Sequence, residues 1–303
     1  MPDFVRDGRV CGRYFPPDME TVRTVQEMQS ASTALKRQGR RVALVPTMGA
    51  LHDGHAALIR QARATGAAVV VSIYVNPTQF GPHEDFKQYP RDLEADTELC
   101  QREQADAIFA PSDDEMYPGG QVGPMAATTW VEETAISRRF EGERRPGHFR
   151  GVCSVVAKLF NIVQPDLAMF GQKDYQQLKV VQRMVRDLRY AIQIEPVPTV
   201  REPDGLARSS RNRMLSHSER VQAAVLWKAL SVARDLFNDG EQNAHRLESA
   251  MNRTISLAPA TRLDYAQIVD GETLEPVTKV QHGNVALVAV HLGKVRLIDN
   301  LIL

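Results

Sequence analysis

Residues 46–55 read Pro-Thr-Met-Gly-Ala-Leu-His-Asp-Gly-His, and this stretch decides the expected fold. An apolar run at 41–45 precedes it and is typical of a buried strand, whereas residues 56–63 continue with a helical pattern. The stretch is therefore predicted to be a strand-to-helix turn. The amide groups at the start of such a helix point out of the turn and favour an anion, above all a phosphate chain.

Two glycines and two histidines give this turn its chemical character. Gly49 and Gly54 let the backbone approach a ligand where a Cβ atom would collide. His52 and His55 can donate hydrogen bonds to phosphate oxygens. Two histidines at this spacing are also compatible with a metal pair or with helix capping, although no third metal ligand follows at a suitable spacing. The turn alone leaves these alternatives open.

The first two thirds of the chain alternate strand-like and helix-like segments. The strand-like segments are residues 41–46, 69–75, 107–110, 167–170 and 192–197, and the clearest helical patterns are residues 90–104, 151–163 and 177–189. Short strands rich in Val, Ile and Leu that alternate with helices predict a parallel sheet covered on both faces. We therefore predict an α/β fold, with a Rossmann-like doubly wound domain over residues 1–199 and an extension at residues 1–17. Ligands of such sheets bind at the carboxyl ends of the strands, where the turn lies.

The remaining residues follow a different order. After a break near residues 196–199, a turn-rich segment leads into helical stretches at 218–239 and 241–257. Strand-like segments follow them at residues 263–269, 285–291 and 295–298. Helices followed by strands predict a smaller α+β domain over residues 200–303.

The composition is that of an ordinary globular protein. Of the 303 residues, 43% are hydrophobic and 24% are charged, and Lys plus Arg equal Asp plus Glu at 37 each. This balance argues against a broad nucleic-acid surface, and three scattered cysteines argue against a disulfide framework. No apolar run approaches the roughly 20 residues that a membrane span needs, and the N-terminus has no apolar signal core. We expect a cytoplasmic protein that binds neither nucleic acid nor membrane.

Three further segments place polar side chains where they can meet a ligand. Residues 76–82, Asn-Pro-Thr-Gln-Phe-Gly-Pro, follow a strand, and their side-chain amides can recognise a small polar molecule. Residues 170–177 offer Lys173 as a point charge for phosphate and Asp174 as a helix cap, a partner of Lys173 or a metal contact. Residues 208–213, Arg-Ser-Ser-Arg-Asn-Arg, offer hydroxyl and guanidinium groups to phosphate oxygens. A plain turn, a solvated lysine and a polar linker are the structural alternatives.

Together these motifs resemble one family. The element from His52 to His55 is similar to the HIGH signature of nucleotidylyltransferases and class I aminoacyl-tRNA synthetases, and residues 209–212 resemble their KMSKS loop in an altered form. The strings that narrow the resemblance to the pantoate–β-alanine ligase (pantothenate synthetase) family are residues 46–55, 75–81, 147–152, 171–177 and 209–212, in the family's order. The resemblance extends from residue 22 to residue 301. Arg208 and Gln172 depart from it, because a small or apolar residue and Glu are frequent at these positions.

The resemblance implies an ATP-dependent ligase that condenses (R)-pantoate with β-alanine through a pantoyl adenylate, releasing AMP and pyrophosphate. It also implies Mg²⁺, whose ligands the sequence does not identify. The implied catalytic residues are His55, as proton donor, with His52, Lys173 and Arg211, while Gln79 and Gln177 bind the two substrates. The implied ATP contacts are Met48, Gly49, Ala50, Leu51, His52, Asp53, Gly54, His55, Gly171, Gln172, Lys173, Asp174, Val200, Arg208, Ser209, Ser210 and Arg211.

The implied chemistry is physically reasonable for this chain. The carboxylate of pantoate is ionised at about pH 7, so the first step needs no general base, but the sequence names no base for the β-alanine amine. A mixed anhydride must be kept from water, and we expect residues 200–303 to close over it as a lid. The family also suggests a homodimer. The alternatives are another nucleotidylyltransferase that acts on a phosphorylated acceptor, and a non-catalytic nucleotide-binding regulator.

Overall fold

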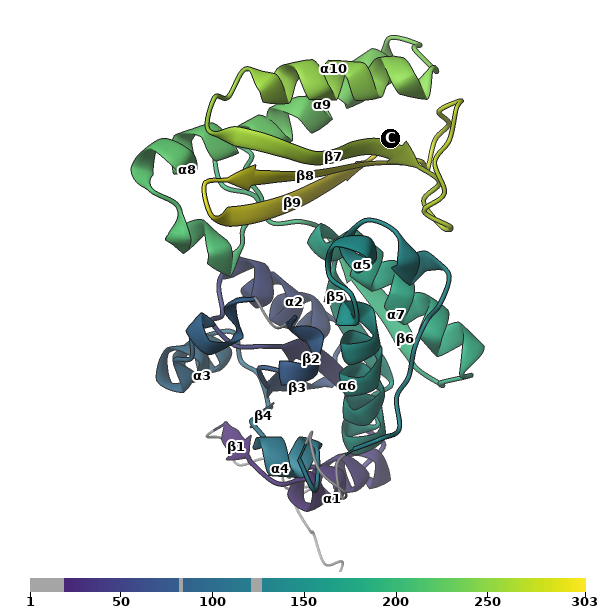
Figure 1. The fold of residues 1–303 in the computed structure, drawn as a ribbon. Coiled ribbons are helices and arrows are strands. Elements are labelled where there is room, and N and C mark those ends of the chain that lie inside the picture. Colours follow the sequence, from purple (N-terminus) through teal and green to yellow (C-terminus); the bar gives the residue numbers. More distant parts are fainter. Residues whose placement is uncertain (1–18, 82–83, 121–126) are drawn as a thin grey trace, which may run out of the picture.

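The computed structural model describes residues 19–81, 84–120 and 127–303, so the expected extension at 1–17 and Pro82 lie outside the described residues. Its larger unit is built on a six-stranded parallel sheet with the order β1-β4-β3-β2-β5-β6 (Figure 1). The strands are β1 (Glu20–Val22), β2 (Val42–Thr47), β3 (Ala68–Ile73), β4 (Ala107–Phe109), β5 (Leu167–Gly171) and β6 (Gln193–Val197). The predicted doubly wound α/β fold is confirmed.

The strand order explains where a ligand can bind. From β2 the chain winds to β3 and β4 on one side, and it later returns to place β5 and β6 on the other side of β2. The carboxyl end of β2 therefore lies at the point where the winding reverses, which is the usual ligand position in such sheets. Because β2 ends at Thr47, the predicted phosphate turn takes this position.

Helices cover both faces of this sheet, and the side chains of β2 alternate between two hydrophobic cores. Val42 and Leu44 pack in a core shared with α1, α6 and α7, whereas Ala43 and Val45 pack in the core under α2 and α3. All four side chains are fully buried, which is why the strand shows no polar alternation. The helices of this unit are α1 (Val25–Arg37), α2 (Asp53–Ala64), α3 (Leu93–Arg102), α4 (Asp113–Met116), α5 (Glu141–Arg144), α6 (His148–Val163) and α7 (Tyr175–Asp187). Short 3-10 helices are η1 (Pro77–Gln79), η2 (Asp85–Gln88), η3 (Ile136–Arg138), η4 (Gln172–Asp174) and, later in the chain, η5 (Ser210–Met214).

The smaller unit packs two helices against a three-stranded antiparallel sheet, as the α+β prediction requires. Its strands are β7 (Thr261–Val269), β8 (Val285–Leu292) and β9 (Val295–Ile302), and its helices are α8 (His217–Ala223), α9 (Val225–Asn238) and α10 (Ala244–Ser256). One hydrophobic core joins the inner faces of α9 and α10 to the sheet. Figure 1 shows the small sheet stacked on one end of the larger unit. A hydrogen bond from Asn300 to the carbonyl of Gln172, just after β5, identifies that end as the one where the parallel strands finish.

Three details differ from the sequence-based expectations. The single helix predicted at 218–239 is two helices, because α8 ends and α9 begins at Ala224. The last strand continues to Ile302 instead of ending at residue 298, since it pairs with β8 along its whole length. The short strand β1 was not predicted, and it adds to the sheet by pairing with β4. Within the described part of the chain, no helix is both long enough and apolar enough to cross a membrane.

Candidate active site

A cavity of about 250 Å³ lies where the β2 turn, η1, η4 and the segment 198–211 meet. Its wall gathers most of the residues that the sequence singled out, from both units of the fold. Those on the wall are Met48, His52, Gly54, His55, Gln79, Gly171, Lys173, Asp174, Gln177, Val200, Arg208, Ser209, Ser210 and Arg211. Predicted residues outside the wall are Gly49, Ala50, Leu51, Asp53 and Gln172. The residues on the wall lie close enough together to meet one ligand, whereas the other five belong to the same loops but do not line the cavity.

Residues 48–55, here called the histidine turn, are closed by the two histidines themselves. His52 is the N-cap of α2, and its Nδ1 accepts from the amide of Gly54 at 3.1 Å. The Nδ1 of His55 accepts from the amide of His52 at 3.2 Å, so the pair forms a reciprocal capping box. Because each Nδ1 is an acceptor, each neutral ring carries its proton on Nε2. The capping alternative is confirmed, and because capping uses Nδ1, it leaves the Nε2 proton of each ring for a bond to a ligand.

Both rings are kept neutral at physiological pH. Burial, together with the positive charges of Lys173 and Arg213, lowers the pKa of His52 to about 4. Burial and the neighbouring His52 ring, whose centroid is 4.2 Å away, lower the pKa of His55 to about 3. The histidine turn thus presents two hydrogen-bond donors without a positive charge.

Asp96 holds the outer part of the histidine turn from α3. Its carboxylate accepts from the amides of Ala50 at 3.0 Å and Leu51 at 2.7 Å. Gly49 lies at φ +79°, and a Cβ atom there would lie 2.7 Å from the Asp96 carboxylate, so glycine is needed at this position. These contacts explain why residues 49–51 turn away from the cavity.

The turn after β3 is built around the buried side chain of Asn76. Its Nδ2 donates to Gln79 Oε1 at 3.1 Å and to the Gly151 carbonyl at 3.2 Å. Gln79 Nε2 lies 2.9 Å from the sulfur of Met48, which brings the glutamine against the histidine turn. Both amides lie on the cavity wall, where Asn76 holds Gln79 in place.

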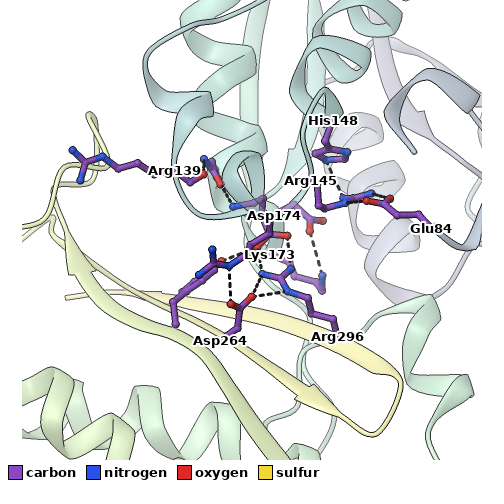
Figure 2. Close-up of polar contacts among 12 residues, drawn as sticks. Glu84, Arg139, Arg145, His148, Lys173, Asp174, Asp264 and Arg296 are labelled. Carbon is purple, nitrogen blue, oxygen red and sulfur yellow. Dashed lines mark hydrogen bonds and ion pairs between the residues drawn. The ribbon is translucent and has the colours of Figure 1, made fainter. Parts of the chain in front are cut away.

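His148 at the start of α6 is a third imidazole on the same wall, and it is buried. Its Nδ1 donates to the Gln79 carbonyl at 2.8 Å, and its Nε2 accepts from Arg145 Nη1 at 3.1 Å. Burial and the Arg145 charge lower its pKa to about 4. Arg145 also pairs through two bonds, of 2.8 and 2.5 Å, with Glu84 (Figure 2). The chain Glu84–Arg145–His148 fixes the backbone of Gln79 from the side opposite Met48.

Opposite the histidine turn, residues 171–174 and 208–211 form what is here called the cationic side. Lys173 Nζ donates to Asp174 Oδ1 at 3.3 Å, and its side chain is 21% exposed. Asp174 takes the N-cap position of α7 but makes no side-chain capping bond, so it acts as a partner of Lys173 and not as a cap. Burial opposes the charge of Asp174, yet the Lys173 charge prevails and lowers its pKa.

The second loop of the cationic side contacts the histidine turn directly. Arg208, which departs from the family pattern, pairs with Asp53 Oδ2 at 3.0 Å. Ser209 caps η5 by accepting from the amide of Arg211 at 3.3 Å. Asp53 is therefore engaged with a side chain of the opposite wall and lies at the rim of the cavity.

A larger cavity of about 880 Å³ adjoins the first one and lies against the small sheet. Residues common to both walls include Lys173, Gln177 and Arg211. Across it, Arg296 donates to both oxygens of buried Glu141, at 2.6 and 2.8 Å, and to Asp264 at 2.9 Å. Figure 2 shows Asp264 and Arg296 reaching from the small sheet toward the larger unit. The pair with Glu141 of α5 holds the two units together, whereas Asp264 lies on β7 of the same small sheet as Arg296. Removing one partner of the buried Glu141 pair would leave an uncompensated charge.

The side chains around the cavity indicate what kind of metal site is possible here. Among the described residues, no group of three or more His, Cys, Asp or Glu side chains is placed to hold a metal ion. Asp174 is the one carboxylate on the wall of the smaller cavity, as far as the structure describes the chain. Such a set fits Mg²⁺, which keeps several waters and is usually held by one or two carboxylates together with substrate phosphates.

Several supporting residues carry no signal in the sequence that would reveal them. Asp96 acts from 45 residues beyond Leu51, and Asn300 acts from 128 residues beyond Gln172. His148 lies in a string that contributed to the family resemblance, but its spacing gave it no function. Only contacts in space identify these three as parts of the site.

Comparisons with known proteins agree with this arrangement. The family model described as pantoate-beta-alanine ligase matches residues 20–302. A pantothenate synthetase from Thermotoga neapolitana is 50% identical over 285 residues, which are 94% of this chain and 100% of that protein. A crystal structure of the pantothenate synthetase from Thermus thermophilus has a TM-score of 0.87 at 48% identity, covering 93% of this chain and 99% of that one. The pantoate-beta-alanine ligase from Francisella tularensis, complexed with beta-gamma ATP and beta-alanine, has a TM-score of 0.75 at 33% identity, covering 94% and 97%.

Proposed function

The chain belongs to the pantoate-beta-alanine ligase family and condenses pantoate with β-alanine at the expense of ATP, and on that premise we propose how its residues share the work. The pantoate carboxylate attacks the α-phosphorus of ATP, so that pyrophosphate leaves and a pantoyl adenylate remains. The amine of β-alanine then attacks the acyl carbon of the adenylate, and AMP leaves. The observation that carries this assignment is one cavity lined by the histidine turn, Lys173, Arg211 and the two glutamines.

In the first step the protein aligns the reactants and stabilises charge. His52 and His55 donate from Nε2 to the phosphates, and their lowered pKa values make them neutral donors throughout the physiological range. His55 therefore acts as a hydrogen-bond donor and does not need to release its proton. Lys173 and Arg211 offset the charge that develops as pyrophosphate departs.

The other residues of the site bind either the two acid substrates, pantoate and β-alanine, or the ATP. Gln79 and Gln177 bind the pantoate, and Gln79 also faces the incoming β-alanine. Support comes from their place on the cavity wall, and from the fixed geometry of Gln79 between Met48 and His148. Of the residues that the family resemblance implies for ATP, those on the cavity wall make the contacts, namely Met48, His52, Gly54, His55, Gly171, Lys173, Asp174, Val200, Arg208, Ser209, Ser210 and Arg211. Gly49, Ala50, Leu51, Asp53 and Gln172 lie outside that wall and shape the loops that carry these contacts.

Mg²⁺ accompanies the ATP in this proposal. The phosphates and water would supply most of its ligands, and Asp174 is the side chain that would hold it. When bound, the ion would neutralise part of the phosphate charge and make the departing pyrophosphate a better leaving group.

The second step requires a dry site, and residues 200–303 act as the lid that provides it. Support comes from the ion pairs of Arg296 with Glu141 and of Arg144 with Asp264, which join the two units on the wall of the larger cavity. Limited proteolysis with and without ATP and pantoate tests the lid. Special protection of the segment 201–213 is expected, and equal protection along the whole chain would contradict it.

We also propose that the chain works as a homodimer in the cytoplasm. The dimer rests on the family alone, and light scattering during gel filtration tests it. The cytoplasm is supported by the free thiols of Cys100 and Cys153, which suit a reducing compartment. Fractionation of the source cells tests that location.

One assay tests the reaction scheme. Pantoate without β-alanine should support exchange of labelled pyrophosphate into ATP, and AMP should accumulate only when β-alanine is added. Exchange that depends on a phosphorylated acceptor, or none at all, would instead favour a nucleotidylyltransferase of another kind or a regulator.

A further inference from the structure

Asn300 of β9 reaches out of the small sheet to the loop that carries Lys173. Its Nδ2 donates to the carbonyl oxygens of Gln172 and of Lys173, both at 2.9 Å. Asn300 is only 6% exposed, so these two bonds are shielded from water. These two bonds fix the peptide groups on both sides of the Lys173 Cα atom, to which the lysine side chain is attached. The direction in which Lys173 enters the cavity is thus set by a residue of the other unit.

The preceding residue, Asp299, holds the second loop of the cationic side. Its carboxylate accepts from Arg201 at 2.6 and 3.1 Å, and Asp299 is 3% exposed. Arg201 stacks on Trp227 at 3.9 Å and begins the turn that leads to Ser209. Successive side chains of a strand point to opposite faces, so one dipeptide can serve two loops that lie on either side of it.

We propose that Asp299 and Asn300 are positioning residues for the adenylation step, which bring the two loops of the cationic side into register. Through Asn300 the Lys173 amine meets the phosphates, and through Asp299 the Ser209–Arg211 segment meets the same phosphates. The inference rests on the proposed function, because it assumes that these loops bind the polyphosphate of ATP. It assigns to β9, whose Asp299 and Asn300 also line the larger cavity, a part in placing the two loops.

The loop that carries Lys173 is not fixed by capping side chains of its own. Gly171, the N-cap of η4, has no side chain that could cap it, and Asp174, the last residue of η4, makes no side-chain capping bond to α7. The loop of Lys173 therefore takes its side-chain support from Asn300, and a shift of about 1 Å at such a group can cost about 100-fold in rate.

The test separates the two half-reactions in the full-length protein. Asn300→Ala should lower the turnover of pantoate-dependent ATP–pyrophosphate exchange by roughly 10–100-fold, with little change in the KM for pantoate. Aminolysis of supplied pantoyl adenylate by β-alanine should stay near the wild-type rate, since that step no longer involves pyrophosphate. Asn300→Asp keeps the shape but sets a carboxylate against two carbonyl oxygens, so it should show the same split. Asp299→Asn should do so more weakly, because it removes the charge and one of the two bonds from Arg201 but keeps an oxygen that can accept the other.

Asn284→Ala is the matched control. Asn284 is 7% exposed, lies next to β8 of the same sheet, and its side chain accepts from the amide of Gln281 at 2.8 Å, away from both cavities. It should lower the thermal midpoint without slowing exchange. If both Asn300 variants slow the two half-reactions equally, or slow neither, the positioning function is wrong. Should Asn300→Ala fail to fold, Asn300→Asp decides alone. Wild-type protein without pantoate-dependent exchange would instead refute the proposed function.

Discussion

The two halves of the phosphate site are supported in different ways. The histidine turn is held by bonds within residues 48–55 and by Asp96, all of which belong to the larger unit. The cationic side is held by Asp299 and Asn300, which belong to the smaller unit. One half is therefore complete when the parallel sheet has folded, whereas the other is complete only when the two units are docked. Substitutions can separate these two kinds of support.

The largest effect is expected on the cationic side. Lys173→Met keeps the apolar stem and removes the charge, so the departing pyrophosphate loses a stabilising partner. Exchange should fall by about 100–1,000-fold, or about 3–4 kcal/mol of barrier. The thermal midpoint should fall only slightly, because the lost pair with Asp174 is partly exposed. Lys228→Met, on the exposed face of α9, is the control and should leave the rate alone. Normal exchange by Lys173→Met would remove this lysine from the reaction.

The histidine turn should lose somewhat less. His55→Asn can still cap the His52 amide but has no donor at the Nε2 position, and we expect about a 100-fold slower exchange. His55→Gln places an amide N–H near that position and should retain more activity than the asparagine variant. Steady-state exchange rates and thermal melts of both variants check this. Near-normal turnover of both would show that His55 has only its capping function.

A third change disturbs the support of Gln79 next to the histidine turn. A Cβ atom on Gly151 would lie 2.4 Å from the Thr78 carbonyl oxygen and 2.7 Å from the Gln79 Cα, and backbone atoms cannot move aside cheaply. Gly151→Ala should therefore cost about 1–3 kcal/mol of stability, measured by urea unfolding, and raise the KM for pantoate. Gly171→Ala meets nothing within 4 Å and serves as the stability control. Equal stability of the two variants would contradict the close packing of α6 on η1.

How far the sequence predicts this molecule depends on where each signal lies. The strands β2 and β3 are continuous apolar runs, buried on both faces, and their positions follow from the sequence to within about two residues. The polar three-residue strand β1 has no such run and exists because β4 offers it an edge. The division at Ala224 is also hidden, since this residue keeps helical dihedral angles and carries no helix breaker.

The site, like the fold, can be predicted where its signals are local in the sequence. The histidine turn can be recognised from the sequence because its capping histidines, its glycines and the preceding strand lie within one short stretch. Asp96 and Asn300 have ordinary neighbours in the sequence, and their functions depend on partners 45 and 128 residues away. The half of the site with local support could thus be predicted in detail, whereas for the other half only the residues that meet the ligand could be named.

Acid should weaken the two halves in different pH ranges. Burial lowers the pKa of His52 and His148 to about 4, so the unfolded chain binds more protons than the folded one below the ordinary histidine pKa. Stability is therefore complete above about pH 6.5 and falls toward about pH 4, by at most about 1.4 kcal/mol per pH unit for each histidine. The pKa of Asp174 is lowered, because the Lys173 charge outweighs burial, so the cationic side loses stability only at lower pH.

Urea unfolding at a series of pH values checks this order. His148→Asn should make the decline between about pH 6.5 and pH 4 shallower, whereas substitution of the exposed His217 should not. A decline of the same steepness in both variants would mean that the buried imidazole of His148 does not bring about the loss.

The smallest effect is expected where the two halves touch directly. Arg208 and Asp53 lie 3.0 Å apart, but their side chains are 40% and 57% exposed, so solvent screens the pair. A double-mutant cycle with Arg208→Ala and Asp53→Ala should give a coupling of about 0–1 kcal/mol, which shrinks further in high salt. Arg208→Ala should then raise the KM for ATP less than about fivefold. A coupling well above that range would mean that the two halves are aligned through this surface pair. A small coupling leaves their alignment to the buried contacts of Asp299 and Asn300, which water cannot screen.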